Sequence, residues 1–275
     1  MAAGHVVVDP REGDVLLIDH DVPFGPYPGL LARHNRAFLY PHGANPIFSA
    51  DGIHPVHEKT RGQFVIGEGH QQILDTFYPL PTAMTGWPFG PVLPFRPGEP
   101  RRVLYAATHA LGDGRIGDAE ARVNQETHAR LADLPIELTV RHVGPLDHSR
   151  LQPLAGVIYQ QAEHHDLAAS IDAADVAVSA GGSFPYIAAS RGCPLVMVGQ
   201  DDWPVDHIPG GTRRAATWDL YRDLYRYPHD GDGDLLVHLE RACVDDVPDW
   251  RKRFIGDPMD PAEFAAQFER AVTEW

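Results

Sequence analysis

The chain has 275 residues, of which 43% are apolar and 22% are charged, and its formal net charge is −15. This apolar fraction excludes global disorder, and the length allows one large or two modest domains. The 25 prolines and 26 glycines exceed the usual share of about 12% but stay below the roughly 25–30% of low-complexity chains, so they predict many turns between short elements. The negative charge argues against a surface that mainly binds nucleic-acid phosphates, but it does not exclude a local basic cleft.

The cysteines and the amino terminus indicate a compartment. Cys193 and Cys243 lie far apart without neighbouring ligand spacing, so we expect neither a disulfide framework nor a cysteine zinc site. Residues 1–9 lack the basic and apolar pattern of a signal peptide, and no stretch reaches the roughly 18 apolar residues that span a bilayer. We therefore predict a cytoplasmic protein in a reducing compartment, without a membrane span.

Short apolar and β-branched runs alternate with helix-like segments, which is the pattern of a parallel sheet covered by helices. In the first third of the chain, this pattern predicts strands at 6–8, 15–19, 37–40 and 64–67 and a helix over 70–77. These are fewer units than a full Rossmann half contains. We therefore expect an abbreviated amino-terminal domain, unless another chain completes it.

Seven prolines crowd residues 79–100 and interrupt the alternation. Clustered prolines are typical of linkers, because proline neither donates a backbone hydrogen bond nor continues a helix. We therefore place a first domain at residues 1–96 and a second domain at residues 97–260.

The alternation restarts after this stretch. It predicts strands at 103–107, 136–142, 176–179 and 195–198 and helices over 118–131, 167–173 and 184–191. This order is that of a second doubly wound domain. At the end of the chain, Phe264, Phe268, Ala271 and Val272 recur at helical spacing, so residues 261–275 are predicted to form an amphipathic closing helix.

Familiar ligand motifs are missing from the sequence. It contains neither G-x-x-x-x-G-K-[ST] nor G-x-G-x-x-G. The histidine pairs His54 with His57 and His164 with His165 lack the i, i+4 spacing of a helical zinc motif. We therefore predict no metal site.

Residues 174–198 are the most informative segment. Their pattern predicts a buried strand, a Gly-Gly-Ser turn, a short helix, a Gly-Cys-Pro stop and a second buried strand. Such a turn presents backbone N–H groups and a helix amino terminus to an anion such as a diphosphate. Gly181 and Gly182 let a ligand approach the backbone, and Ser183 either caps the helix or bonds a phosphate oxygen. A tight turn without a ligand is the alternative.

Further short motifs occur in order along the chain. Residues 40–43 read Tyr-Pro-His-Gly, 85–88 read Thr-Gly-Trp-Pro, 103–109 read Val-Leu-Tyr-Ala-Ala-Thr-His, and 140–142 read Val-Arg-His. With the glycine turn, they resemble nucleotide-dependent transferases of the GT-B fold, particularly the CDP-glycerol glycerophosphotransferase-like group and the related UDP-N-acetylglucosamine 2-epimerase type. Ala107 and Val143 stand where that group has proline, and residues 186–188 lack the acidic residue that often meets the ribose. The resemblance implies an α/β fold with two Rossmann-like domains: an abbreviated acceptor-side domain at residues 1–96 and a nucleotide-binding domain at residues 97–260.

The resemblance also implies where a donor would bind. A nucleotide-activated donor, UDP- or CDP-linked, would be held by the second domain without any further cofactor. The residues implied to line its diphosphate are Thr108, Arg141, Gly181, Gly182 and Ser183. For Arg141, a surface position is the alternative. Residues 99–275 carry 17 basic and 29 acidic side chains, so the donor must be held by local backbone dipoles and a few arginines.

The implied catalytic residues are two histidines. His42 would be the general base for the acceptor hydroxyl, because a neutral imidazole has its pKa near working pH. His142 would protonate or bond the leaving phosphate. Three residues that follow the strand 195–198 would contact the donor sugar or the acceptor, with a polar surface loop as the alternative: Asp201, Asp202 and Trp203.

The main hypothesis is a metal-independent glycosyltransferase that moves a sugar from a nucleotide-sugar donor to a hydroxyl acceptor in an interdomain cleft. The runner-up reactions in the same fold are CDP-glycerol-type glycerol phosphate transfer and UDP-sugar 2-epimerisation. A hydroxymethylated DNA base is an alternative acceptor, and the one nucleic-acid partner that we consider. A non-catalytic nucleotide- or glycan-binding protein is the alternative outside the enzymes, and a homodimer stays open.

Overall fold

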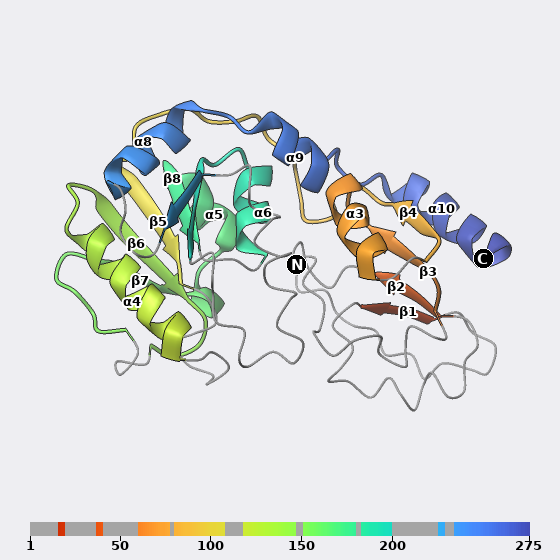
Figure 1. The fold of residues 1–275 in the computed structure, drawn as a ribbon, viewed down its shortest axis with the longest axis horizontal. Helices are drawn as coiled ribbons and strands as arrows, with labels where there is room; N and C mark the ends of the chain where they lie inside the picture. Colours follow the sequence, from red (N-terminus) through yellow and green to blue (C-terminus); the bar gives the residue numbers. More distant parts are fainter. Residues whose placement is uncertain are drawn as a thin grey trace.

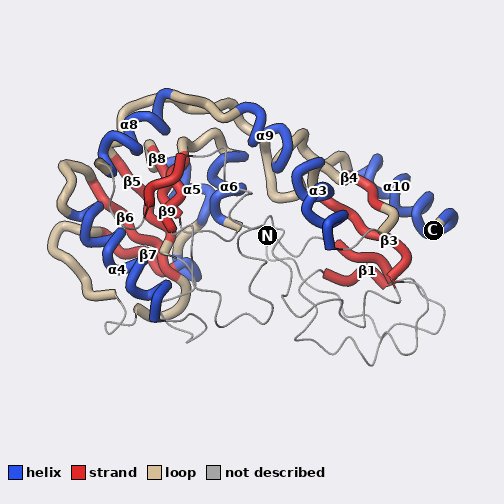
Figure 2. The backbone as a smooth tube through the Cα atoms, in the orientation of Figure 1, coloured by secondary structure: helices blue, strands red, loops and turns tan. Residues whose placement is uncertain are grey.

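The structure is a computed structural model of the chain. It describes residues 16–19, 37–40, 60–77, 80–107, 118–146, 151–179, 183–199, 225–228 and 234–275, and every structural statement below concerns these residues. Two parallel sheets lie at opposite ends of the long axis of the molecule, and helices pack against each (Figure 1, Figure 2). In the described part of the chain, no helix is long and apolar enough to cross a bilayer.

The first sheet has four parallel strands in the order of the chain. They are β1 (Leu16–Asp19), β2 (Ala37–Tyr40), β3 (Thr60–Val65) and β4 (Thr82–Met84), and helix α3 (Glu68–Phe77) joins the last two. The predicted strands 15–19 and 37–40 and the predicted helix 70–77 are confirmed with small shifts at their ends. The predicted strand 6–8 lies outside the described residues.

β3 differs from the prediction, because it begins at Thr60, four residues early, and ends before Gly67. The glycine and polar residues at its start have the composition of a loop. They form a strand because they pair with β2, and the residues that follow pair with β4 as well. Trp275 packs on Gly62, where a Cβ atom would overlap its ring. β4 was also missed, since it lies inside the proline-rich stretch.

The second sheet has six parallel strands in the order β10-β9-β8-β5-β6-β7. They are β5 (Arg102–Ala106), β6 (Glu137–His142), β7 (Ile158–Gln161), β8 (Val176–Ser179), β9 (Leu195–Gly199) and β10 (Tyr225–Pro228). The helices of this half are α4 (Asp118–Ala132), the short 3₁₀ helix η2 (Ala162–His164), α5 (Leu167–Ala173), α6 (Phe184–Ser190), α8 (Leu235–Val244) and α9 (Pro248–Phe254). All seven elements predicted between residues 103 and 198 are confirmed, whereas β7, β10, η2, α8 and α9 were not predicted.

The chain order reverses in the middle of the second sheet. The chain enters at β5, moves outward through β6 and β7, and then returns to the other side of β5 as β8 before moving outward again through β9 and β10. The point between β5 and β8 is therefore a topological switch point. The described strands of the first sheet show no such reversal.

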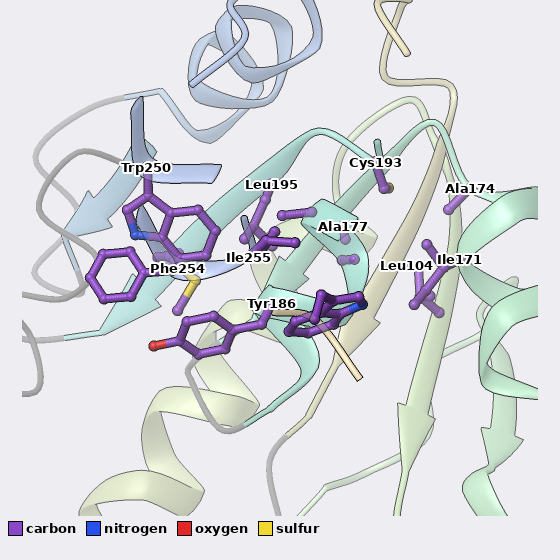
Figure 3. Packing of buried hydrophobic residues seen from close by; sticks show 14 of the residues in the cluster. Leu104, Ile171, Ala174, Ala177, Tyr186, Cys193, Leu195, Trp250, Phe254 and Ile255 are labelled. Carbon is purple, nitrogen blue, oxygen red and sulfur yellow. The ribbon is translucent and has the colours of Figure 1, made fainter. Parts of the chain in front are cut away.

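Both faces of the second sheet are buried, as a parallel sheet between helices requires. Val103 and Tyr105 of β5 belong to the core under α4 and α8, and Leu104 belongs to the core under α5 and α6. In that second core, the ring of Tyr186 stacks on the ring of Trp250, with centroids 5.3 Å apart (Figure 3). Successive strand residues face opposite sides, so a strand buried on both faces is apolar throughout.

The last helix, α10 (Pro261–Glu274), packs on the first sheet and confirms the predicted closing helix (Figure 1). Asp260 caps it by accepting hydrogen bonds from two backbone N–H groups of the first turn. Its apolar stripe covers the strands: the rings of Phe264 and Phe64 lie 5.5 Å apart, and those of Phe268 and Phe38 lie 6.1 Å apart. The domain boundaries at 96 and 260 stay predictions.

The two halves meet where α3 packs against α9 and α6. The ring of His70 on α3 lies 5.6 Å from the ring of Phe254 and 5.7 Å from the ring of Tyr186. Gly67 allows this approach, because a Cβ atom there would lie 2.7 Å from the backbone oxygen of Arg253. The helix that follows β8 is therefore in contact with the first half of the chain.

Candidate functional site

The carboxyl ends of the central strands of the second sheet lie level with one another. Ala106, the last residue of β5, pairs with Arg141 on β6 and with Ser179 on β8. Ser179 in turn pairs with Met197 on β9, and the backbone N–H of Ala107 donates to the oxygen of Arg141 at 3.1 Å. Segments that leave these strands therefore start at one edge of the sheet.

This edge contains the topological switch point between β5 and β8. Ligands of open parallel sheets bind outside the carboxyl ends of the strands at such a point, because the two flanking connections diverge to opposite faces and leave room between them. Thr108 follows β5 by two residues, and the Gly-Gly-Ser turn that contains Gly181 and Gly182 follows β8. The sequence therefore puts the predicted diphosphate residues other than Arg141 shortly after the two strands of the switch point.

Ser183 stands at the amino end of α6 with φ −80° and ψ −16°. Its side chain makes no capping hydrogen bond, so the first of its two predicted roles is wrong. The reason is backbone conformation: a capping residue has extended φ and ψ angles, whereas Ser183 is already helical. The second role, a bond to a phosphate oxygen, stays a prediction.

Helix α6, which follows the Gly-Gly-Ser turn in the sequence, is held in place by packing. Pro185 lies in its first turn, and its missing N–H leaves no intrahelical bond unmade. The fully buried ring of Tyr186 stacks on Trp250 (Figure 3). It also lies 5.7 Å from the ring of His70, and Ala188 and Ala189 are buried in the same core. The helix that begins at the predicted donor turn is thus held rigidly in the core.

His142 is the last residue of β6 and is 5% exposed. Its ring Nδ1 lies 2.9 Å from the backbone oxygen of Gly144. A carbonyl oxygen only accepts, so this contact assigns the proton of the neutral ring to Nδ1 and leaves Nε2 with a lone pair. The backbone N–H of Gly144 donates to Oε1 of Glu163 at 2.9 Å, so the turn after β6 is held from both sides.

Arg141 lies inside the protein and not on its surface, which corrects one of the two predicted positions. Its guanidinium donates to the backbone oxygens of Ala162 and His165, at 3.2 and 2.9 Å, and to Oγ of Ser170 at 3.3 Å. Burial lowers the pKa of Arg141, and the nearby carboxylates of Asp166 and Glu163 oppose this shift. The side chain ties the segment between β7 and α5 to β6, and its predicted contact with a diphosphate stays a prediction.

The remaining predicted site residues lie outside the described part of the chain. They are His42, Thr108, Gly181, Gly182, Asp201, Asp202 and Trp203. His42 comes two residues after β2, and Asp201 two residues after β9, so each follows the carboxyl end of a strand in the sequence. Their roles stay predictions.

Sequence reasoning missed two members of the site, Gly144 and Glu163. Gly144 has a φ of +70°, a left-handed conformation that favours glycine. A glycine two residues after a histidine at a strand end is a local signal for such a turn. Glu163 carries no comparable signal, because its partner lies 19 positions away.

The fold defines the class of the protein as an α/β protein with two Rossmann-like halves. No family model and no curated protein matches the chain. Solved structures do. CalG4, the calicheamicin glycosyltransferase, has a TM-score of 0.53 and 16% identity over 95% of this chain and 74% of CalG4. SnogD, a glycosyltransferase from Streptomyces nogalater, has a TM-score of 0.51 and 17% identity over 93% of this chain and 72% of SnogD.

TarM also matches, with a TM-score of 0.51 and 12% identity over 96% of this chain and 56% of TarM. At these identities the likeness concerns the fold. The chain has a GT-B-like fold, and its abbreviated first half agrees with the partial coverage of these larger structures. The narrower resemblance to CDP-glycerol transferases and 2-epimerases stays a prediction.

Proposed function

We propose that the chain is a glycosyltransferase that moves a sugar from a nucleotide-sugar donor to a hydroxyl acceptor. The observation that carries this proposal is the switch point between β5 and β8, where Ala106 pairs with Ser179. Thr108 and the turn at 181–183 follow these two strands in the sequence. The GT-B-like fold shared with CalG4 and SnogD supports it.

The donor is proposed to be UDP- or CDP-linked, with its diphosphate at the Gly-Gly-Ser turn. Backbone N–H groups of Gly181 and Gly182, and the hydroxyl groups of Thr108 and Ser183, supply donors for the phosphate oxygens. Ser183 suits this role because its hydroxyl is not used as a helix cap. Arg141 is proposed to attract the diphosphate through its positive charge and not through direct hydrogen bonds, because its guanidinium donates to protein oxygens.

The transfer forms a bond from the acceptor oxygen to the anomeric carbon and breaks the bond from that carbon to the diphosphate oxygen, which leaves with the electron pair. His42 accepts the proton of the acceptor hydroxyl. When its ring is doubly protonated, His142 gives the Nε2 proton to the leaving phosphate and returns to the neutral form, whose Nδ1–H stays bonded to Gly144. Asp201, Asp202 and Trp203 are proposed contacts of the sugar or acceptor.

We propose that no metal takes part, because backbone and side-chain donors stabilise the leaving diphosphate. Turnover that persists in excess chelator supports this part, and turnover restored only by a divalent cation contradicts it.

A thermal-shift screen with UDP-, CDP-, GDP- and TDP-linked sugars tests the donor site. A ligand at 100 times its dissociation constant stabilises the folded state by about 2.7 kcal/mol, so a donor gives a clear rise in Tm. No shift with any of them contradicts the proposal. Product analysis with the donor that binds then separates sugar transfer from glycerol phosphate transfer and 2-epimerisation, and binding without any product leaves a nucleotide-binding protein.

A further inference from the structure

Three groups form a short chain of hydrogen bonds at the end of β6. His142 Nδ1 lies 2.9 Å from the oxygen of Gly144, and the N–H of Gly144 lies 2.9 Å from Oε1 of Glu163. We infer that Gly144 and Glu163 are positioning residues that hold His142 in the Nδ1–H form, so that the ring exchanges its proton at Nε2. This inference rests on the proposed function, because that function makes His142 catalytic.

Gly144 makes the inner bond because of its backbone conformation. Its φ of +70° turns the carbonyl oxygen back toward the His142 ring. A Cβ atom built on Gly144 meets nothing within 4 Å, so a substitution there changes the turn only through backbone strain. Gly144→Ala is therefore a clean probe of the turn.

Glu163 holds the other end of the same turn. Its carboxylate accepts the Gly144 N–H, and this bond is the largest cause of the lowered pKa of Glu163. The two bonds of Gly144 lie on either side of its Cα atom, so together they fix both its φ and its ψ. Without the outer bond, the bond to the His142 ring alone restrains the Gly144 carbonyl.

Glu163 is itself held in place by Arg141. The guanidinium donates to the oxygens of Ala162 and His165, which flank Glu163 in the sequence. Arg141 and His142 are consecutive strand residues, so their side chains leave opposite faces of β6. Arg141 thus holds the segment that contains Glu163, and the Glu163 carboxylate binds the backbone N–H of Gly144 in the turn after His142.

The test is the tautomer of His142 in the full-length chain labelled with ¹⁵N-histidine, without donor, at a pH where the ring is neutral. Two-bond proton–nitrogen correlations distinguish the Nδ1–H form from the Nε2–H form, and His142→Gln assigns the signal. The wild type is expected to show the Nδ1–H form. Predominance of the Nε2–H form overturns the inference without any variant.

Glu163→Ala and Gly144→Ala are expected to produce a mixture of both forms, whereas Glu163→Gln keeps the wild-type pattern because its amide oxygen still accepts the Gly144 N–H. Glu240→Ala, which removes an exposed glutamate on α8, is the control and keeps the pattern. A wild-type pattern in Glu163→Ala overturns the inference, and so does a mixture in Glu163→Gln. Circular dichroism confirms that each variant is folded.

Turnover adds a second readout once a donor is known. Glu163→Ala is expected to lower kcat about tenfold with KM changed less than about threefold, and Glu163→Gln restores kcat. An unchanged kcat in Glu163→Ala overturns the inference. If no donor is found, the proposed function fails, and the tautomer of His142 still decides the positioning role.

Discussion

The second sheet has an amino edge, where its parallel strands begin, and a carboxyl edge, where they end. The two edges use their charged and polar groups differently. At the amino edge, the Asp175 carboxylate accepts from the backbone N–H and the guanidinium of Arg102, and Arg96 donates to the backbone oxygens of Ile171 and Asp172. At the carboxyl edge, His142 is oriented through one nitrogen, and the Ser183 hydroxyl makes no capping bond. The charged groups at the amino edge thus pair within the protein, whereas the carboxyl edge contains His142 and Ser183, for which we propose ligand roles.

The difference follows from the topology of parallel sheets. All strands of the sheet point the same way, so every βα turn with its helix amino terminus falls on one edge and every αβ turn on the other. An edge that receives no ligand gains stability from internal pairing. Substitutions at the carboxyl edge should therefore change turnover, and substitutions at the amino edge should change stability.

The largest expected effect comes from His142→Gln at the carboxyl edge. Removing a general acid–base group lowers kcat by about 100-fold to 10,000-fold, whereas the Tm changes little because the lost bond joins the side chain to one turn. Steady-state kinetics and a melting curve measure the two effects. A variant that keeps wild-type kcat removes His142 from the mechanism, and a large fall in Tm would make it a structural residue like those of the amino edge.

The next effect belongs to Gly192, in the αβ turn that precedes β9. Its φ is +71°, and a Cβ atom there would overlap the backbone oxygen of Pro94 in the linker. Strain and overlap together are expected to lower the free energy of unfolding of Gly192→Ala by about 2–5 kcal/mol. Urea unfolding measures this loss.

Gly156 offers the matched control. Its φ of +81° imposes similar backbone strain, but a Cβ atom meets nothing within 4 Å. Gly156→Ala is therefore expected to cost only about 1–2 kcal/mol. Equal losses in the two variants would show that the contact of Gly192 with the linker does not contribute.

The sequence predicted the second half of the chain well, because its signals are local. Asp166 accepts from the N–H of Ala169 and starts α5, and the apolar run 176–179 forms β8 as predicted. β7 escaped because Ile158–Gln161 is a short edge strand with two glutamines. β4 was missed because it lies in the proline-rich stretch, whose composition predicts a loop. Its pairing with β3, which makes it a strand, cannot be read from that composition.

The sequence predicted members of the candidate site only where a short local motif marks them. His142 was predicted because Val140-Arg141-His142 resembles a strand-end motif of the GT-B group, and its place at the end of β6 is confirmed. The surroundings of Arg141 and Glu163 were not, because their partners lie about 20 positions away and are brought together by the packing of β6, β7 and η2. Contacts of this kind depend on the tertiary fold, and spacing in the sequence does not encode them.

A smaller effect is expected from His128, which lies between the two edges on α4. Its Nε2 is 2.8 Å from the Tyr159 hydroxyl, and burial lowers the pKa of His128. As the pH falls below about 6.5, His128 therefore binds a proton in the unfolded chain before it does so in the folded protein. Stability should fall with pH by at most about 1.4 kcal/mol per unit, until the folded state is protonated as well.

Urea unfolding between pH 7.5 and pH 5 measures this slope, with His128→Asn as the comparison. The slope of the variant is expected to be shallower, since the remaining titrating groups are shared by both chains. Identical slopes would mean that His128 does not contribute to the pH dependence of stability.

The smallest effect is expected from Asp175→Asn at the amino edge. Burial by itself would raise the pKa of Asp175, but the hydrogen bonds from Arg102 outweigh it and bring the pKa below its usual value. The carboxylate therefore stabilises the fold above pH 4 and loses this effect as the pH falls through its folded pKa.

The loss in Asp175→Asn is expected to stay below about 1 kcal/mol at neutral pH, because the Arg102 side chain is 53% exposed and water screens the pair. The asparagine oxygen can still accept the backbone N–H of Arg102, so the substitution removes the ion pair and the guanidinium hydrogen bond to Oδ1 and keeps the backbone bond. Urea unfolding at low and high salt measures it, and the difference from wild type should shrink with salt. A loss that is much larger, or independent of salt, would place Asp175 among the buried determinants of the fold. A loss of turnover at unchanged stability would instead show that the amino edge takes part in function, and the contrast between the two edges would no longer hold.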